Sequence, residues 1–305
     1  MRCLQLLRGV HVTEPMNAEV KSRPTGTCVC RLSKSDFGFE GEVASKFAFS
    51  EWRCIPPMIF LVYRTVVAVY MLFWAVYFIP EAIDYNKEQF LLFFSNIGFL
   101  LLAVYLVIAC VTSWHYFVIL EIQVSRGMRG NRSAEDASSE TNTRLLWYFK
   151  LLWFLYPIVS GSALVVTIVY WGALYRESEF PSVIDFHIHA MNSVIILIDI
   201  SINAIPVRFA HCIYSLLFSA LYVIMTVIFW AADGHNYYDG GNYLYTILDY
   251  GGSPIPSAIA VCGIFVAVVV LYALLFGVYK MKICIHGGDE PPDTSRQEAN
   301  SSVAV

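Results

Sequence analysis

Charged residues are scarce in this sequence. Asp, Glu, Lys and Arg make up only 14% of its 305 residues, whereas a soluble domain carries about 25%. Hydrophobic residues make up 57%, and the mean hydropathy is +0.58. This composition excludes an ordinary soluble domain and indicates a membrane protein. The net charge of −4 says little by itself, because the orientation depends on where Lys and Arg lie in the chain. We expect no nucleic-acid partner.

Several recognisable signals are also missing. Residues 1–51 lack the apolar core and cleavage site of a signal peptide, so the first spanning segment is expected to direct insertion. Because no cysteine lies in a predicted outer loop, we expect no disulfide framework. Cys28 and Cys30 form a close pair without other ligands nearby, which is a weak metal signal. We therefore predict no metal and no other cofactor.

Six apolar stretches have the length needed to cross a bilayer as a helix, which is ~20 residues. They occupy residues 57–79, 90–111, 146–171, 186–205, 209–231 and 256–279. The predicted fold is an all-α, polytopic membrane protein with six transmembrane helices in residues 57–279. Residues 1–56 form a predicted N-terminal tail. Residues 280–305, which are rich in Pro, Ser and acidic residues, form a predicted disordered C-terminal tail.

The positive charges predict the orientation in the membrane. Lys and Arg gather in both tails and in the loop after the second span, while the loop between the fifth and sixth spans has neither. That loop carries Asp233, Asp239 and Asp249 instead. By the positive-inside rule, both termini are predicted to be cytoplasmic.

Polar residues share one face of the fourth predicted span. His189, Asn192, Ile196, Asp199 and Asn203 follow each other at intervals of three or four residues. Polar groups are costly in hydrocarbon, so this face should turn toward other helices or a wet cavity. A structural hydrogen-bond network is the interpretation we favour for such a stripe. A transporter or channel would use the same stripe, but we find no inverted repeat to support it.

Two further polar positions lie inside predicted spans. Arg64 is close to the cytoplasmic end of the first span, where snorkelling to the interface is favoured over pairing with Asp199. Ser95 and Asn96 lie one to two turns into the second span, at the predicted depth of His189. A hydroxyl–imidazole pair requires such a shared depth, although depth alone does not create a contact.

The loop of residues 233–256 is rich in tyrosine and glycine. Tyrosines at a membrane boundary usually form an interfacial belt. A cap over a cavity and a surface that binds another cell's protein are the alternatives. We favour the belt and the cap over adhesion.

Several of these residues resemble the rolling stone family of multi-pass membrane proteins. The matching positions are His189-Ala-Met-Asn-Ser-Val, Asp199, Ile205-Pro-Val-Arg208, His211, Tyr214, Phe94-Ser-Asn-Ile-Gly98 and Tyr245-Thr-Ile-Leu-Asp249-Tyr250. The resemblance covers roughly residues 52–279, and Ser95, Ile97, Ser215 and Tyr250 depart from the family pattern. The family takes its name from a protein implicated in myoblast fusion during muscle development. The resemblance implies a role in cell–cell fusion or development, at the plasma membrane rather than the endoplasmic reticulum, with membrane lipids or a surface protein as partners.

A more distant similarity, to the androgen-induced family of membrane hydrolases, implies a different function. Those enzymes use an intramembrane Thr and His to cleave esters of fatty acids. Carried over to this chain, the catalytic pair would be Ser95 and His189, supported by Asn96, Asn192 and Asp199, and the substrate would be a lipid ester. The Gly-x-Ser-x-Gly motif of many soluble esterases is absent. A fusion protein without catalytic activity and a lipid-ester hydrolase therefore remain two open hypotheses.

Overall fold

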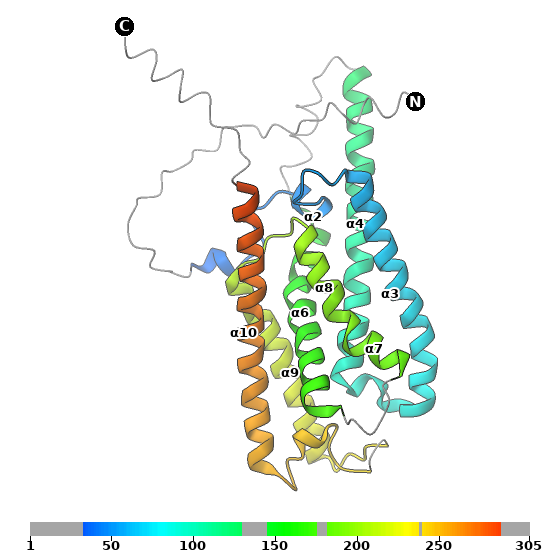
Figure 1. The fold of residues 1–305 in the computed structure, drawn as a ribbon, viewed down its shortest axis with the longest axis vertical. Helices are drawn as coiled ribbons and strands as arrows, with labels where there is room; N and C mark the ends of the chain where they lie inside the picture. The colour runs from blue at the N-terminus through cyan, green and yellow to red at the C-terminus, as the bar shows by residue number, and fades with distance from the viewer. Residues whose placement is uncertain (1–32, 130–144, 176–181, 238–239, 288–305) are drawn as a thin grey trace.

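The computed structural model describes residues 33–129, 145–175, 182–237 and 240–287. Within these ranges the chain is helical, and the described part contains no β-strand (Figure 1). Five helices are long and apolar enough to cross a membrane. They are α3 (Pro57–Asn86), α4 (Phe94–Arg129), α6 (Trp147–Val169), α9 (Cys212–Ala231) and α10 (Pro254–Gly287). The prediction of an all-α polytopic membrane protein is confirmed.

The fourth predicted span is broken in two. Helix α7 (Val183–His189) and helix α8 (Met191–Ile202) meet at Ala190 and are bent by 41°. Helix α7 begins at Ser182, whose hydroxyl accepts a hydrogen bond from the Asp185 amide and thus caps the helix. Counted as one bent span, the two helices bring the number of candidate spans in the described residues from five to six, and the polar stripe runs across the break.

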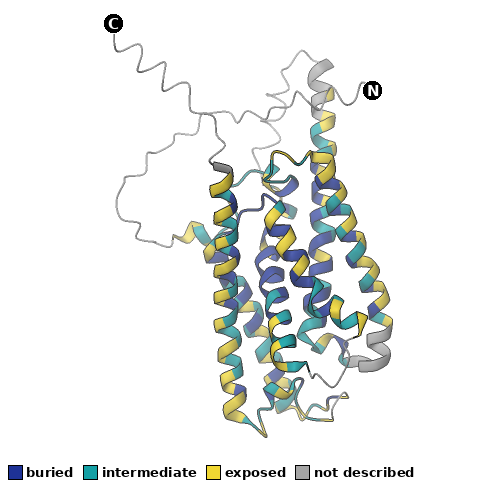
Figure 2. Cartoon of the chain, in the orientation of Figure 1, coloured by how far each residue is buried: buried dark blue, intermediate teal, exposed yellow. Residues whose placement is uncertain are grey.

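Helix α6 is the central helix of the bundle. Within its apolar stretch 72% of the residues are buried, against 22% in α10 (Figure 2). Small residues allow the close approach: a Cβ on Gly161 would lie 3.0 Å from Oγ of Ser215 in α9. The Ser215 hydroxyl also donates to the Pro157 carbonyl at 2.7 Å. The small residues of α6 therefore form a close contact with α9.

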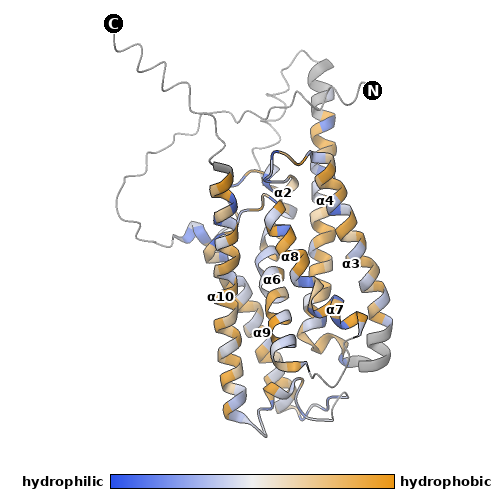
Figure 3. Cartoon of the chain, viewed as in Figure 1, coloured by the Kyte–Doolittle hydropathy of each residue, from blue (hydrophilic) through white to orange (hydrophobic). Residues whose placement is uncertain are grey.

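The outward-facing side of the bundle carries exposed apolar side chains. Along α3 the side chains of Val62, Val66, Val69, Phe73 and Val76 are each more than half exposed. Hydrophobic residues predominate along α3 and α10 (Figure 3). A soluble monomer rarely exposes so large an apolar surface, so this face is expected to contact lipid.

The N-terminal segment, defined as residues 33–53, packs over one end of the bundle. It is the end where α3 begins and α10 ends (Figure 1), and we call it the inner end, and the opposite one the outer end, after the orientation predicted from the sequence. The short helix α2 (Ser45–Ala48) inserts Phe47, which is fully buried against Phe149 and Trp153 of α6. Ser50 forms a bridge with Asn203 at the end of α8. This part of the predicted tail is therefore an integral part of the packed structure.

The loop at the opposite, outer end caps the start of α4. The hydroxyl groups of Tyr245 and Tyr222 both accept hydrogen bonds from the Phe94 amide, at 3.0 and 3.1 Å. Tyr222 in turn donates to the Leu92 carbonyl at 2.8 Å. Burial raises the pKa of Tyr245, so its phenol stays protonated. These contacts hold the loop against the start of α4.

Candidate functional site

A buried carboxylate joins three helices in the interior. Asp199 lies in α8, and each of its two carboxylate oxygens accepts two hydrogen bonds. Oδ1 accepts from Arg64 at 2.7 Å and from Tyr63 at 3.2 Å. Oδ2 accepts from Tyr105 at 2.8 Å and from Asn203 at 2.9 Å. Because its acceptor sites are filled, Asp199 serves here as a junction between α3, α4 and α8.

The favoured snorkelling of Arg64 is wrong. Its side chain is 1% exposed and forms an ion pair with Asp199, which is 0% exposed. The Phe60 ring covers one face of the guanidinium, with its centroid 5.0 Å from Cζ. Arg64 projects into the bundle rather than along its surface, so a carboxylate on a facing helix is its available partner.

Lys282 is a second buried cation at the inner end. Its Nζ donates to the Ile200 carbonyl at 2.9 Å and to the Asn203 carbonyl. These carbonyls belong to the C-terminal end of α8, where a positive charge is favourable. The sequence interpretation missed this residue and placed it in the C-terminal tail. Its apolar neighbours Met281 and Ile283 were the available signal.

The two histidines of α7 stack on aromatic rings of neighbouring helices. The His187 ring lies 3.5 Å from that of Trp74 in α3. The His189 ring lies 3.6 Å from that of Tyr170, in the turn that follows α6. Nδ1 of His189 is buried and has no hydrogen-bond partner within the described ranges. The stacking holds α7 between α3 and the outer end of α6.

The other predicted site residues make separate contacts. Asn96 donates to the Phe90 carbonyl at 2.9 Å, and Asn192 donates to the Ile188 carbonyl at 2.6 Å. Ser95 contacts Tyr245 of the outer loop. No hydrogen bond joins Ser95 to His189 in the part of the chain that the structure describes. The geometry therefore does not assemble the nucleophile and base that a serine hydrolase needs.

This arrangement predicts that Ser95 is not an activated nucleophile. We expect a serine-reactive fluorophosphonate to label the native chain in membranes no more strongly than the Ser95→Ala and His189→Ala variants. The measurement is fluorescence of the labelled band at equal protein amounts. Labelling of the native chain that is lost in both variants would contradict this expectation and would establish the hydrolase hypothesis.

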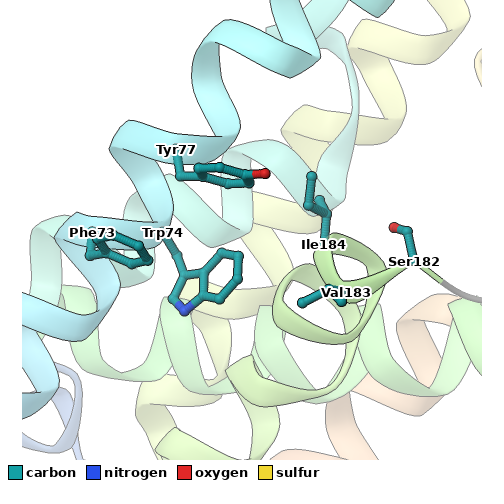
Figure 4. Close-up of a pocket in the computed structure, with 6 residues that line it drawn as sticks. All are labelled: Phe73, Trp74, Tyr77, Ser182, Val183 and Ile184. Atoms are coloured by element: carbon teal, nitrogen blue, oxygen red, sulfur yellow. The ribbon is translucent and has the colours of Figure 1, made fainter.

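A pocket of about 360 Å³ opens between α3 and α7 near the outer end. Figure 4 shows Phe73, Trp74 and Tyr77 on one side, and Ser182, Val183 and Ile184 on the other. The Ser182 hydroxyl is already bonded to Asp185. The lining thus offers aromatic and aliphatic surface and no acid, base or cationic group, so it suits an apolar chain better than a reacting substrate.

No metal-binding cluster of His, Cys, Asp or Glu occurs among the residues that the structure describes. Cys54, Cys110, Cys212, Cys262 and Cys284 are free thiols. Cys28 and Cys30 lie outside the described residues.

Arg208 holds the N-terminal segment against the bundle, a role that the sequence did not suggest. Its guanidinium donates to the carbonyls of Ser35, Gly38 and Glu40 at 3.1, 2.9 and 2.7 Å. It also packs over Trp153, with Cζ 4.5 Å from the ring centroid. One side chain between α8 and α9 thus binds three successive parts of the segment.

His211 and Tyr214 extend this contact. A ring nitrogen of His211 lies 3.2 Å from the Gly38 carbonyl, and the Tyr214 hydroxyl donates to the Phe37 carbonyl at 2.6 Å. Phe39 packs against the rings of both residues. Arg208, His211 and Tyr214, three positions that carry the family resemblance, therefore form the surface on which the N-terminal segment docks.

Comparison with known proteins identifies the relatives of this chain. The family model described as Protein rolling stone matches residues 27–287, which includes the N-terminal segment. Protein rolling stone of Drosophila melanogaster is 30% identical over 258 residues, which cover 82% of this chain and 88% of that protein. No solved structure matches the chain. Through this match along most of its length, the chain belongs to the rolling stone family.

Proposed function

We propose that this protein acts at the plasma membrane in cell–cell fusion or development, without catalysing a reaction. The supporting observation is the use of its interior polar groups. Asp199 accepts four hydrogen bonds from surrounding side chains, and Ser95 and His189 contact different partners. These contacts stabilise the bundle and leave no assembled catalytic pair.

The outer loop is the surface that we assign to this role. Tyr245 of the loop ties it to the start of α4. The hydroxyl of Tyr250, also in the loop, lies 2.8 Å from the hydroxyl of Thr226 in α9. A pinned loop presents its exposed residues in a fixed arrangement, which lowers the entropic cost of binding a partner. Tyr237 is 51% exposed, and Asn242 and Thr246 are also exposed. The partner would be a protein on the surface of an apposed cell.

A rescue experiment in fusing cells tests this function. Cells that lack the protein would receive the native chain, Asn242→Arg, Thr246→Arg, or the control Glu121→Arg, which changes an exposed residue near the inner end of α4. Surface biotinylation would establish equal delivery to the plasma membrane. We expect the two loop variants to lower the number of fused cells several-fold and the control to restore fusion fully.

The opposite pattern would refute the assignment. Full rescue by both loop variants would exclude the outer loop as the working surface. Normal fusion in cells without the protein would exclude the fusion role. Retention of the native chain in the endoplasmic reticulum would exclude action at the plasma membrane.

A further inference from the structure

Arg64 has an unused hydrogen-bonding edge inside the bundle. Its Nη1 donates to Asp199, but Nε and Nη2 are buried and have no partner within the described ranges. These two nitrogens lie on the same edge of the planar guanidinium. Their N–H groups point in parallel, at the spacing that matches the two oxygens of a carboxylate. The unused edge is therefore the part of arginine best suited to a two-oxygen anion.

The surrounding side chains do not supply an acceptor for this edge. Asp199 already accepts from four donors. The Tyr105 hydroxyl gives its proton to Asp199 and also interacts with the Arg64 guanidinium, but Nε and Nη2 have no hydrogen-bond partner within the described ranges. Phe60 covers a face of the guanidinium rather than an edge. Buried polar groups in proteins are normally paired, so the vacant edge calls for an acceptor from outside the fold.

Two more buried polar atoms without a hydrogen-bond partner in the described ranges lie on the broken span formed by α7 and α8. Nδ1 of His189 and Oδ1 of Asn192 are also buried without a partner. Apart from Ser257 Oγ, every such atom in the described part of the chain belongs to Arg64 or to these two residues. His189 and Asn192 flank the bend at Ala190. Broken helices inside a membrane commonly line binding sites, because the freed polar groups there need a partner.

The charge balance of the interior favours an anion. Lys282 is 4% exposed and bonds only backbone carbonyls, while Arg64 pairs with Asp199. Glu51 of the N-terminal segment is another acid near Lys282, but it lies at the rim and is only partly buried. Among the described residues, two buried cations, Arg64 and Lys282, thus share one buried carboxylate, and a bound anion would compensate the excess positive charge.

We propose that Arg64 binds a carboxylate ligand through its Nε and Nη2 groups, in the interior of the bundle. The ligand is a water-soluble organic acid or the head group of a fatty acid, since both present the same two oxygens. The edge is closed to solvent in this structure. Entry therefore accompanies a movement of the helices, for which the bend between α7 and α8 provides a hinge.

The direct test observes the Arg64 Nε–H group by NMR. The full chain, labelled with nitrogen-15 arginine, would be placed in nanodiscs, and the Arg64 signal assigned by its absence in Arg64→Lys. Acetate and octanoate are the probes, with acetamide and octanamide as uncharged controls of the same shape. We expect a saturable shift of the Nε–H signal with a carboxylate and none with the amides. A response to acetate indicates a soluble acid, and a response to octanoate alone indicates a fatty acid.

Thermal unfolding supplies a second measurement. The melting temperature of the native chain is expected to rise with carboxylate concentration, because ligands that bind only the folded state stabilise it. Arg64→Lys retains a charge for Asp199 but lacks the two-donor edge, so it should lose this response. Tyr214→Phe, a variant at the inner end, should keep it.

Two results would overturn the proposal. The first is an Nε–H signal and a melting temperature that do not change with either acid. The second is an equal response to the acids and the amides, which would mean that the edge binds water or any polar solute. If Arg64→Lys does not fold, the melting comparison of acids and amides on the native chain still decides between these outcomes.

Discussion

Replacement of Asp199 with alanine is expected to destabilise the folded protein by about 3–5 kcal/mol, the usual effect of removing one partner of a buried ion pair. Arg64 would then remain as a cation, 1% exposed, without the carboxylate that compensates its charge. Tyr105, Tyr63 and Asn203 would lose the same acceptor. The measurement is reversible unfolding of the purified chain in mixed micelles, monitored by tryptophan fluorescence.

A double substitution separates the ion pair from general loss of packing. Arg64→Met with Asp199→Leu replaces both charges by apolar groups of similar size, and such replacements are often neutral or stabilising. We expect the double variant to recover the part of the stability that is lost through the unpaired Arg64 charge, but not the part due to Tyr63, Tyr105 and Asn203, which still lack their acceptor. A loss below about 1 kcal/mol in Asp199→Ala would be typical of an exposed pair and would contradict the buried junction.

Replacement of Arg208 with alanine is expected to release the N-terminal segment from the bundle. The substitution removes hydrogen bonds to three backbone carbonyls and the contact with Glu42, whose Oε1 lies 3.5 Å away. Hydrogen bonds to a charged donor contribute roughly 1.5–3 kcal/mol each when buried, and Arg208 is 22% exposed. Since neighbouring contacts such as Phe47 remain, we expect a net loss of about 2–4 kcal/mol in docking of the segment.

Limited proteolysis measures this release. Trypsin should cleave after Lys34 and Lys46, which are exposed but held in the docked segment. Each 1.4 kcal/mol changes the open population about tenfold, so cleavage should accelerate by roughly 30-fold or more. Tyr214→Phe removes a single bond, to the Phe37 carbonyl, and should accelerate cleavage much less. Equal cleavage of the native chain and Arg208→Ala would contradict the role of Arg208 in holding the N-terminal segment against the bundle.

Local hydrophobicity was sufficient to predict the membrane architecture. Lipid offers no hydrogen bonds to the backbone, so an apolar stretch of the right length must be helical wherever it crosses. The predicted spans at residues 57–79, 146–171 and 209–231 overlap α3, α6 and α9 along most of their length. The fourth predicted span falls on α7 and α8, but the pattern of apolar and polar residues contained no signal for the bend at Ala190.

The polar stripe shows the limit of a sequence pattern. Spacing placed Asp199 and Asn203 on one face of a helix, and that much is a property of the helix itself. Which residues this face meets depends on the rotation and order of the helices, which packing decides. The partnership of Arg64 with Asp199 and the separate contacts of Ser95 and His189 follow from packing, because depth in the membrane constrains only one coordinate.

The sequence by itself thus determined the helical membrane fold and its family, because both are recorded in local composition and in matching residues. Only the tertiary structure decided what the polar residues do. Arg208 and Ser35 are far apart in the chain, and nothing local in either indicates that one binds the other. Contacts of this kind depend on how distant segments are brought together, so Asp199 became a junction and the N-terminal segment a part of the bundle only once the helices were packed.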